Sequence, residues 1–195
     1  MKILLSTKIE RDKKNKTFIN IIDRNILRFV NKLFLNSEIS IYDTQKNFSN
    51  YDAYFSFGGN NLPKFSNKQN DKIRFNLEKK AIKAFIRNKK PIIGVCYGAQ
   101  IIAHLFYSKI KTIKNHTNKY HLLKFDRKKL IVNSYHDYAI YKLGKGLDSI
   151  AVAADGTHEA FINVEKKILG IMWHPERNII FKKTDIDLIK RYLKK

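Results

Sequence analysis

Cysteine is almost absent from this sequence, and long apolar runs and acidic residues are scarce. The single cysteine among 195 residues, Cys96, cannot form an internal disulfide and excludes a Cys-rich metal site. No apolar run approaches the roughly 20 residues that a membrane-spanning helix needs. The apolar start of the chain is short and is followed by dense charge, unlike a secretory signal. We therefore expect a cytoplasmic protein without a membrane partner.

Acidic residues number 17 against 39 lysines and arginines, which gives a formal net charge of +22. Such an excess of positive charge favours an anionic partner: a nucleic acid, a membrane surface or a phosphorylated small molecule. The other explanation is a compositional bias toward Lys, Asn and Ile, since the basic residues are spread along the chain without a single block. The aromatic residues do not cluster with the basic ones as a base-stacking platform requires. A basic nucleic-acid-binding module with an inactive site is therefore the alternative that we do not favour.

No internal repeat, linker or low-complexity tract divides the chain, and residues 1–195 are expected to form one domain. In the first half, short apolar runs typical of buried strands alternate with helical periodicity. The expected strands are residues 2–6, 38–42, 53–57 and 91–95, and the helical repeats are Ile22, Ile26, Val30 and Phe34, then Ile73, Leu77, Ala84 and Phe85. Strands that alternate with helices predict a parallel sheet covered on both faces.

The second half is rich in strands, with Gly and Asp at the turns. Strands are expected at residues 120–125, 130–134, 150–154, 159–164 and 168–173, and a final helix at residues 185–195. The predicted fold class is therefore α/β, with a mostly parallel central sheet and an antiparallel elaboration in the second half.

Cys96 stands in the segment Gly94-Val95-Cys96-Tyr97-Gly98, between an apolar strand and a helical pattern. A strand that enters a helix through G-x-C-x-G is the cysteine form of a nucleophile elbow. The glycines permit close backbone approach in the sharp turn, and the helix N-terminus lowers the pKa of the thiol. Most lone cysteines are small buried hydrophobic residues instead. The flanking glycines favour a nucleophile.

A thiol nucleophile needs a base, and the base needs an orienting partner. His174 and Glu176 follow the apolar strand at residues 168–173 and are separated by Pro175. In extended backbone, residues i and i+2 project the same way, so Glu176 is expected to orient His174 toward Cys96. Pro175 stiffens the pair because its ring fixes its own φ. A histidine near a strand end is often structural, but the His-Pro-Glu pattern downstream of a cysteine elbow favours a catalytic role.

The combination of G-x-C-x-G-x-Q with a distant W-H-P-E resembles the class I glutamine amidotransferase superfamily, and within it the free-standing γ-glutamyl hydrolases. The resemblance covers most of the chain. It implies a flavodoxin-like three-layer fold, a Cys-His-Glu triad of Cys96, His174 and Glu176, and neither a cofactor nor a metal. It also implies an oxyanion hole made by the backbone N–H groups of Gly59 and Tyr97, where preorganised donors lower a barrier by several kcal/mol.

The same resemblance implies that Gln100, Tyr135, Asp137 and Tyr138 contact the glutamyl group of the substrate. The last three lie in residues 132–140, which resemble the segment whose backbone holds the α-amino and α-carboxylate groups. Tyrosine at strand ends is also common without such a role. Glu159 falls in another family-like segment and is interpreted either as lying near the substrate or as part of a turn.

The superfamily divides into glutaminase subunits, which deliver ammonia to a synthase, and hydrolases, which release a free amine. Residues 6–12 (STKIERD) resemble the hydrolase branch, so a separate synthase partner is an alternative that we do not favour. Two small-molecule γ-glutamyl substrates stand out in that branch. One is of the γ-glutamyl-γ-aminobutyrate type, and the other is γ-glutamyl-CDP-amidate, whose hydrolysis yields cytidine diphosphoramidate for capsule decoration. The start of the chain and residues 170–177 favour the second.

A diphosphate leaving group needs cationic or N–H partners near the mouth of the site. The candidates are Lys8 and Arg11, expected in a loop after the first strand, and Arg177, just past the triad. Both segments are expected at the carboxyl ends of parallel strands, where ligands bind in such sheets. The alternative for each of these residues is a solvated surface charge.

Overall fold

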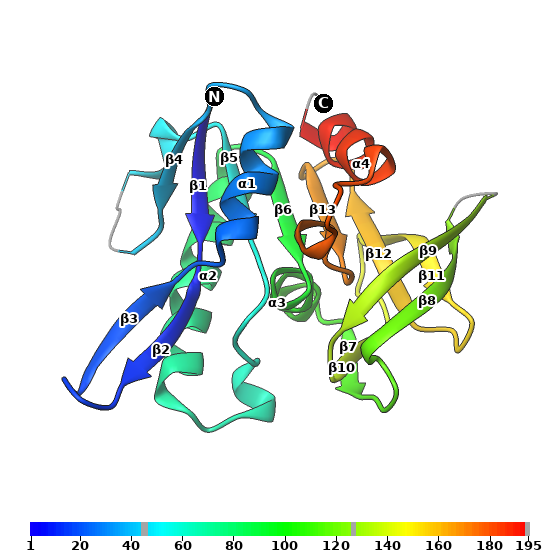
Figure 1. The fold of residues 1–195 in the computed structure, drawn as a ribbon, viewed down its shortest axis with the longest axis horizontal. Coiled ribbons are helices and arrows are strands. Elements are labelled where there is room, and N and C mark those ends of the chain that lie inside the picture. Colours follow the sequence, from blue (N-terminus) through cyan, green and yellow to red (C-terminus); the bar gives the residue numbers. More distant parts are fainter. Residues whose placement is uncertain (44–46, 126–127, 194–195) are drawn as a thin grey trace.

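A mixed sheet of 11 strands runs through the structure, a computed structural model that describes residues 1–43, 47–125 and 128–193 (Figure 1). Its first part is parallel, in the order β4-β1-β5-β6-β13. These strands are β1 (Lys2–Ser6), β4 (Glu38–Ile41), β5 (Ala53–Ser56), β6 (Ile92–Val95) and β13 (Ile168–Ile171). All five lie within a residue or two of the strands that the apolar runs predicted.

The antiparallel part continues from β13 in the order β12-β11-β8-β9, and β10 joins β7 to β12. The bounds are β7 (Lys109–Thr112), β8 (Thr117–Phe125), β9 (Lys128–Tyr135), β10 (Tyr138–Lys142), β11 (Asp148–Ala153) and β12 (His158–Asn163). The predicted antiparallel elaboration is thus present and larger than expected. Strands β7 and β10 escaped prediction because both are short, and β7 exposes all but one of its residues.

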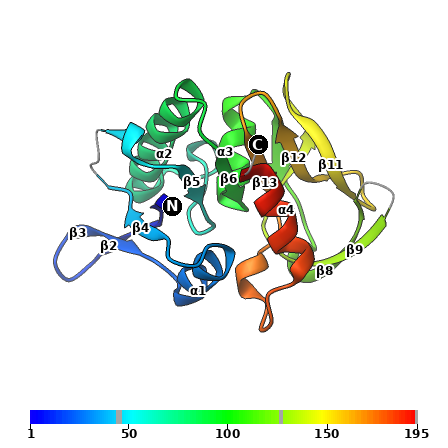
Figure 2. The same ribbon diagram turned by 90° about the horizontal axis from the view of Figure 1, so that it is seen from above.

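Helices cover both faces of the parallel part (Figure 2). Helices α1 (Arg24–Leu33) and α4 (Lys183–Leu193) lie on one face, and α2 (Gln69–Arg87) and α3 (Tyr97–Leu105) lie on the other. Side chains alternate between the faces: Ile3 and Leu5 of β1 join the core under α1 and α4, while Leu4 joins the core under α2 and α3. The predicted α/β class is confirmed. Residues 194–195 of the expected final helix lie outside the described residues.

None of the helices in the described part of the chain is both long and apolar enough to cross a membrane.

A two-stranded hairpin leaves the sheet directly after β1 and projects beyond it (Figure 1). It consists of β2 (Lys8–Asp12) and β3 (Thr17–Ile21), paired from Lys8 with Ile21 to Asp12 with Thr17. The expectation of a loop at Lys8–Arg11 was therefore wrong. The charged residues of β2 hide its strand character, because only Ile9 of this strand is buried.

Candidate active site

Cys96 occupies a sharp turn between β6 and α3, with φ 53° and ψ −103°. Its N–H donates to the carbonyl of Ile171 at 2.8 Å, which ties the turn to the end of β13. The turn is tightly packed: a Cβ atom on Gly98 would lie 2.2 Å from the carbonyl oxygen of Ser56, and Gly94 is crowded by the backbone of Gly98. The expected need for glycine at both positions is confirmed. The strained backbone holds the sulfur at the N-terminus of α3.

The structure brings His174 to both Glu176 and Cys96. His174 Nδ1 lies 2.6 Å from Glu176 Oε1, and both side chains are buried. A Cβ atom on Gly58 would lie 3.6 Å from His174 Nε2 and 3.7 Å from the Cβ of Cys96, so the imidazole and the cysteine flank the same glycine. The expected pairing is present. The expected extended geometry was wrong, because Pro175–Arg177 form a short 3-10 helix after His174.

Asn133 of β9 holds the backbone of His174 in place. Its Oδ1 accepts from the His174 N–H at 2.7 Å, and its Nδ2 donates to the His174 carbonyl at 2.8 Å. The antiparallel part of the sheet therefore positions the base. Asn133 could not be singled out from the sequence, because an amide that pairs with the backbone of a residue far along the chain leaves no local pattern.

The electrostatics of Cys96 and His174 favour a thiolate and an imidazolium. Burial opposes ionisation of Cys96, but the neighbouring His174 outweighs it and lowers the pKa of the thiol. Burial likewise opposes protonation of His174, but Cys96 and Glu176 raise the pKa of the imidazole to about 9. Both charged forms therefore coexist in the pH window between the lowered pKa of Cys96 and the raised pKa of His174.

Replacing His174 with glutamine is expected to slow alkylation of Cys96 by iodoacetamide near neutral pH by about tenfold or more. The substitution removes the charge that holds the thiol pKa down, and an ordinary thiol with a pKa near 8.5 is only about 3% thiolate at pH 7. The measurement is the rate of alkylation from about pH 5 to about pH 10, followed by mass spectrometry. His104→Gln, on the half-buried end of α3, is the control. Superimposable profiles for the wild type and His174→Gln would contradict the ion pair.

Gly59 and Tyr97, the expected oxyanion residues, both line a cavity of about 190 Å³ that reaches Cys96 and His174. The N–H of Tyr97 belongs to the first residue of α3, where backbone donors lack partners within the helix. The structure thus places both residues at the nucleophile.

The four expected substrate residues line the same cavity. Gln100 is buried, and its amide nitrogen donates to the carbonyl of Tyr138 at 3.1 Å. Its amide oxygen takes no part in this hydrogen bond. Tyr138 stacks on Phe65, with ring centroids 4.0 Å apart. Tyr135 meets the ring of His174 edge to face at 5.7 Å. Asp137 is exposed and accepts from Thr117 Oγ1 at 2.5 Å.

A second cavity, of about 470 Å³, adjoins the first and shares Gly59, His174 and Arg177 with it. Lys8 lines it, and so do Ser6, Thr7, Ile21, Asp23, Ile26, Phe57, Gly58 and Glu176. Of the three expected cations, Lys8 and Arg177 border this cavity. Arg11 does not, and instead lines a neighbouring cavity of about 510 Å³ beside the hairpin, which shares Lys8 and Gly59 with this one. His174 therefore lines both the smaller cavity that contains Cys96 and the larger cavity that Lys8 and Arg177 border.

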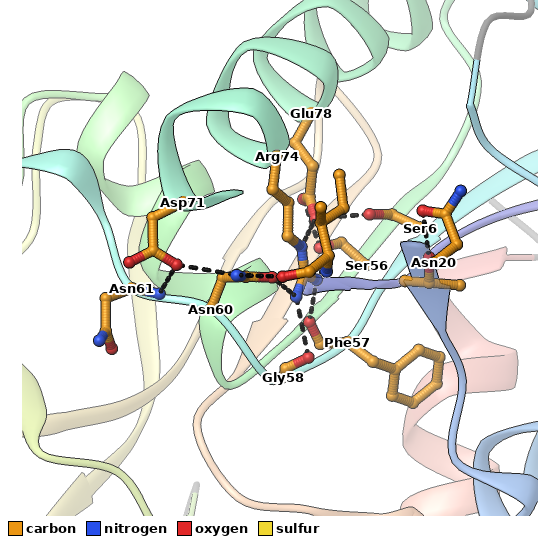
Figure 3. Close-up of polar contacts among 12 residues, drawn as sticks. Ser6, Asn20, Ser56, Phe57, Gly58, Asn60, Asn61, Asp71, Arg74 and Glu78 are labelled. Carbon is orange, nitrogen blue, oxygen red and sulfur yellow. Dashed lines mark hydrogen bonds and ion pairs between the residues drawn. The ribbon is translucent and has the colours of Figure 1, made fainter. Parts of the chain in front are cut away.

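A buried ion pair supports the loop that carries Gly58 and Gly59 (Figure 3). Arg74 and Glu78 of α2 are 1% and 0% exposed, and Arg74 Nε donates to Glu78 Oε1 at 2.8 Å. The two terminal nitrogens of Arg74 donate to the carbonyl of Gly58 at 3.0 Å and to that of Phe57 at 2.5 Å. The loop before the oxyanion residue is thereby clamped to the helix.

Further hydrogen bonds connect Glu78 and Asn60 to neighbouring elements. Glu78 accepts from Ser6 Oγ at 2.6 Å and from Ser56 Oγ, at the ends of β1 and β5. Asn60 donates to Asp71 Oδ1 at 2.8 Å (Figure 3). These contacts correct the expected buried face of α2, since Ile73 and Leu77 are only half-buried whereas the charged residues point inward. An ion pair at i and i+4 was visible in the sequence, but such pairs usually lie on the surface.

Known proteins resemble this chain in sequence and in fold. The profile of the family Glutamine amidotransferase class-I matches residues 18–191. A γ-glutamyl-CDP-amidate hydrolase of Campylobacter jejuni subsp. jejuni serotype O:2 is 43% identical over 138 residues, which cover 68% of this chain and 68% of that protein. The glutamine amidotransferase-like protein YvdE of Lactococcus lactis subsp. lactis is 36% identical over 128 residues, or 54% of each chain. A glutamine amidotransferase crystal structure from Thermotoga maritima has a TM-score of 0.70 at 17% identity and covers 99% of this chain and 84% of its own, so it shares the fold.

Proposed function

The chain belongs to the class I glutamine amidotransferase family, and we propose that it hydrolyses the γ-glutamyl amide bond of γ-glutamyl-CDP-amidate. The observation that carries the proposal is the pair of cavities that meet at His174. The smaller one contains Cys96 and has room for a glutamyl group, and the larger one has room for a leaving group with phosphates. The relative from Campylobacter jejuni, named for this activity, supports the choice of substrate.

The proposed reaction proceeds in two halves. The thiolate of Cys96 attacks the γ-carbonyl carbon, and the N–H groups of Gly59 and Tyr97 hold the oxyanion that develops. As the C–N bond breaks, the imidazolium of His174 gives its proton to the departing nitrogen, and a γ-glutamyl thioester remains on Cys96. The neutral imidazole then takes a proton from water, which attacks the thioester and releases glutamate. Glu176 keeps its charge throughout and orients the imidazole.

The leaving half belongs on the His174 side because that residue protonates the departing nitrogen. Lys8 and Arg177 supply cations there for two phosphates; in the free protein the Lys8 ammonium is ion-paired with Glu10, and Arg177 stacks over Tyr135 at 4.4 Å. Asp23 lines the same cavity, but its carboxylate caps α1 by accepting from the N–H of Asn25 at 2.8 Å. A nucleotide-linked substrate is also consistent with the cytoplasmic location that the sequence predicted.

Lys8→Gln is expected to lower kcat/KM for γ-glutamyl-CDP-amidate about tenfold while leaving kcat/KM for glutamine nearly unchanged. The lysine contacts only the leaving half in the proposed complex, and a charge-assisted contact to phosphate contributes about 1.5–3 kcal/mol. The measurement is released glutamate for both substrates and for γ-glutamyl-γ-aminobutyrate, at low and high salt. The preference of the wild type for the nucleotide should shrink as salt rises, because charges at the mouth are screened.

Arg11→Gln is the matched control, because Arg11 has the same charge on the same strand and lines the cavity beside the hairpin, but unlike Lys8 it does not line the cavity next to His174. An equal loss in Arg11→Gln and Lys8→Gln would place the phosphates outside the proposed chamber. Comparable wild-type rates on glutamine and on the nucleotide amidate would overturn the substrate. They would instead favour a glutaminase subunit that serves a separate synthase.

A further inference from the structure

Three histidines and two carboxylates gather in the antiparallel part of the sheet, away from the triad. His116 precedes β8, His121 lies on β8, and Glu159 lies on β12. In the described part of the chain, one ligand atom from each of these three lies within 4.8 Å of the other two. His136 borders the group on the side of Cys96, whose cavity it lines, and Asp155 borders it on the outside. Glu159 lies within a strand, so of its two interpretations from the sequence the turn role was wrong.

The carboxylate of Glu159 is fully buried, and neither of its oxygens has a hydrogen-bond partner. Its nearest polar neighbours are His136 Nε2 at 3.4 Å and His116 Nδ1 at 3.8 Å from Oε1. Charge-assisted hydrogen bonds are shorter, about 2.7–2.9 Å. His116 Nδ1 and His121 Nε2 are likewise buried without a hydrogen-bond partner. Buried polar atoms are rarely left with such long contacts, so a further partner bound among these groups would complete their coordination.

The orientation of His116 is fixed from its outer side. Its Nε2 lies 2.7 Å from Asp155 Oδ2, so the other ring nitrogen faces Glu159. Asp155 is held in turn by the N–H of Thr157 at 3.0 Å and by the Thr157 hydroxyl at 2.7 Å. A histidine whose outer nitrogen donates to a carboxylate is the usual arrangement around metal ligands, because the carboxylate fixes the tautomer and increases the basicity of the inner nitrogen.

We propose that His116 Nδ1, His121 Nε2 and the carboxylate of Glu159 bind a divalent transition metal ion, with Zn²⁺ as the best match. Two imidazoles and one carboxylate form a common zinc ligand set. Ligand atoms on a tetrahedral zinc lie about 3.3 Å apart, given metal–ligand distances near 2.0–2.1 Å. The observed 3.8 Å between His116 and Glu159 needs only a small contraction. The site runs against the expectation of no metal, which came from the family resemblance, whereas the single cysteine excluded only a Cys-rich site.

The proposed ion ties β8 to β12 behind the nucleophile chamber, with His136 between the ion and Cys96. The role is therefore structural, and the hydrolytic chemistry remains with the triad. The test uses the full chain as Cys96→Ala, because a thiolate beside His174 is itself a competing zinc ligand. The protein is stripped with a chelator, titrated with Zn²⁺ by calorimetry, and titrated with Co²⁺ by absorption spectroscopy.

One equivalent of Zn²⁺ per chain is expected, together with a tetrahedral Co²⁺ spectrum and a rise in Tm with metal. His121→Gln, at a half-buried position, is expected to lower the affinity at least tenfold. Asp155→Asn is expected to lower it about 10–100-fold through loss of the outer partner of His116. His158→Gln is the matched control, because His158 neighbours Glu159 on β12 but lies against Ser149.

The proposal fails if the stripped protein binds no stoichiometric Zn²⁺, or if His121→Gln binds it as tightly as His158→Gln. Either result would leave the cluster as a network of histidines and carboxylates without a metal. Circular dichroism in chelator checks that each variant is folded. Since the readouts are metal binding and Tm, they are independent of the substrate assay.

Discussion

Cys96→Ala is expected to reduce γ-glutamyl hydrolysis by about 10⁴-fold or more while the fold persists. The substitution removes the sulfur that forms the thioester, and enzymes with comparable triads lose most of their rate enhancement with the nucleophile. The turn itself should survive because alanine keeps a Cβ atom in the position that the strained backbone already accommodates. The measurement is glutamate released from the γ-glutamyl substrate, alongside circular dichroism.

Cys96→Ser completes this experiment, since it keeps nearly the same shape but replaces the thiolate with a poorly ionised hydroxyl. It should be as inactive as the alanine variant to within about tenfold. In the wild type, acid quenching during turnover should trap a γ-glutamyl adduct on Cys96, visible by mass spectrometry. Substantial activity in either variant, or an adduct on a different residue, would disprove the nucleophile.

Arg74→Met is expected to lower the free energy of unfolding by about 3–5 kcal/mol, the range for breaking one side of a buried ion pair. The loss leaves the carboxylate of Glu78 buried without its charged partner, and it frees the carbonyls of Phe57 and Gly58. The measurement is urea unfolding followed by circular dichroism. Arg87→Met, at the exposed end of the same helix, is the control and should change stability by about 0.5 kcal/mol or less.

The double variant Arg74→Met/Glu78→Leu separates charge from packing. If the unpaired carboxylate causes most of the loss, removing it should restore a large part of the stability. Activity should be low in the double variant even if its stability is restored, because the carbonyls of Phe57 and Gly58 lack the donors that position the loop of Gly59. A single variant as stable as Arg87→Met would mean that the pair is hydrated and weak.

The sequence revealed those parts of the site whose residues form short local patterns. Cys96 sits between glycines at a strand end, and His174 stands two residues from Glu176, so short patterns identify them. The parallel strands were equally visible, because strands buried on both faces are continuous apolar runs. The local conformation of the His-Pro-Glu turn was not visible, because the 3-10 turn and an extended chain present the same residue order.

The sequence did not reveal buried polar residues whose partners lie far away along the chain. Apolar periodicity assigns charged residues to the surface, so Arg74 and Glu78 were missed although they are among the most buried side chains of α2. Asn133 pairs with the backbone of His174, 41 residues away, which only the folded sheet brings near it. The hairpin of β2 and β3 was missed because its strands are largely exposed and carry no apolar alternation.

Because β6 and β13 are neighbours in the sheet, the thiol of Cys96 becomes reactive only at a late stage of folding. Cys96 and His174 meet only after these two strands pair, and the whole antiparallel part of the sheet lies between them in the sequence. Pairings between segments so far apart along a chain form slowly, because a long loop must first close. During synthesis, Cys96 emerges long before His174 and has the reactivity of an ordinary cysteine. Activation is thus coupled to completion of the fold, which spares unfinished chains from the oxidation that threatens an exposed thiolate.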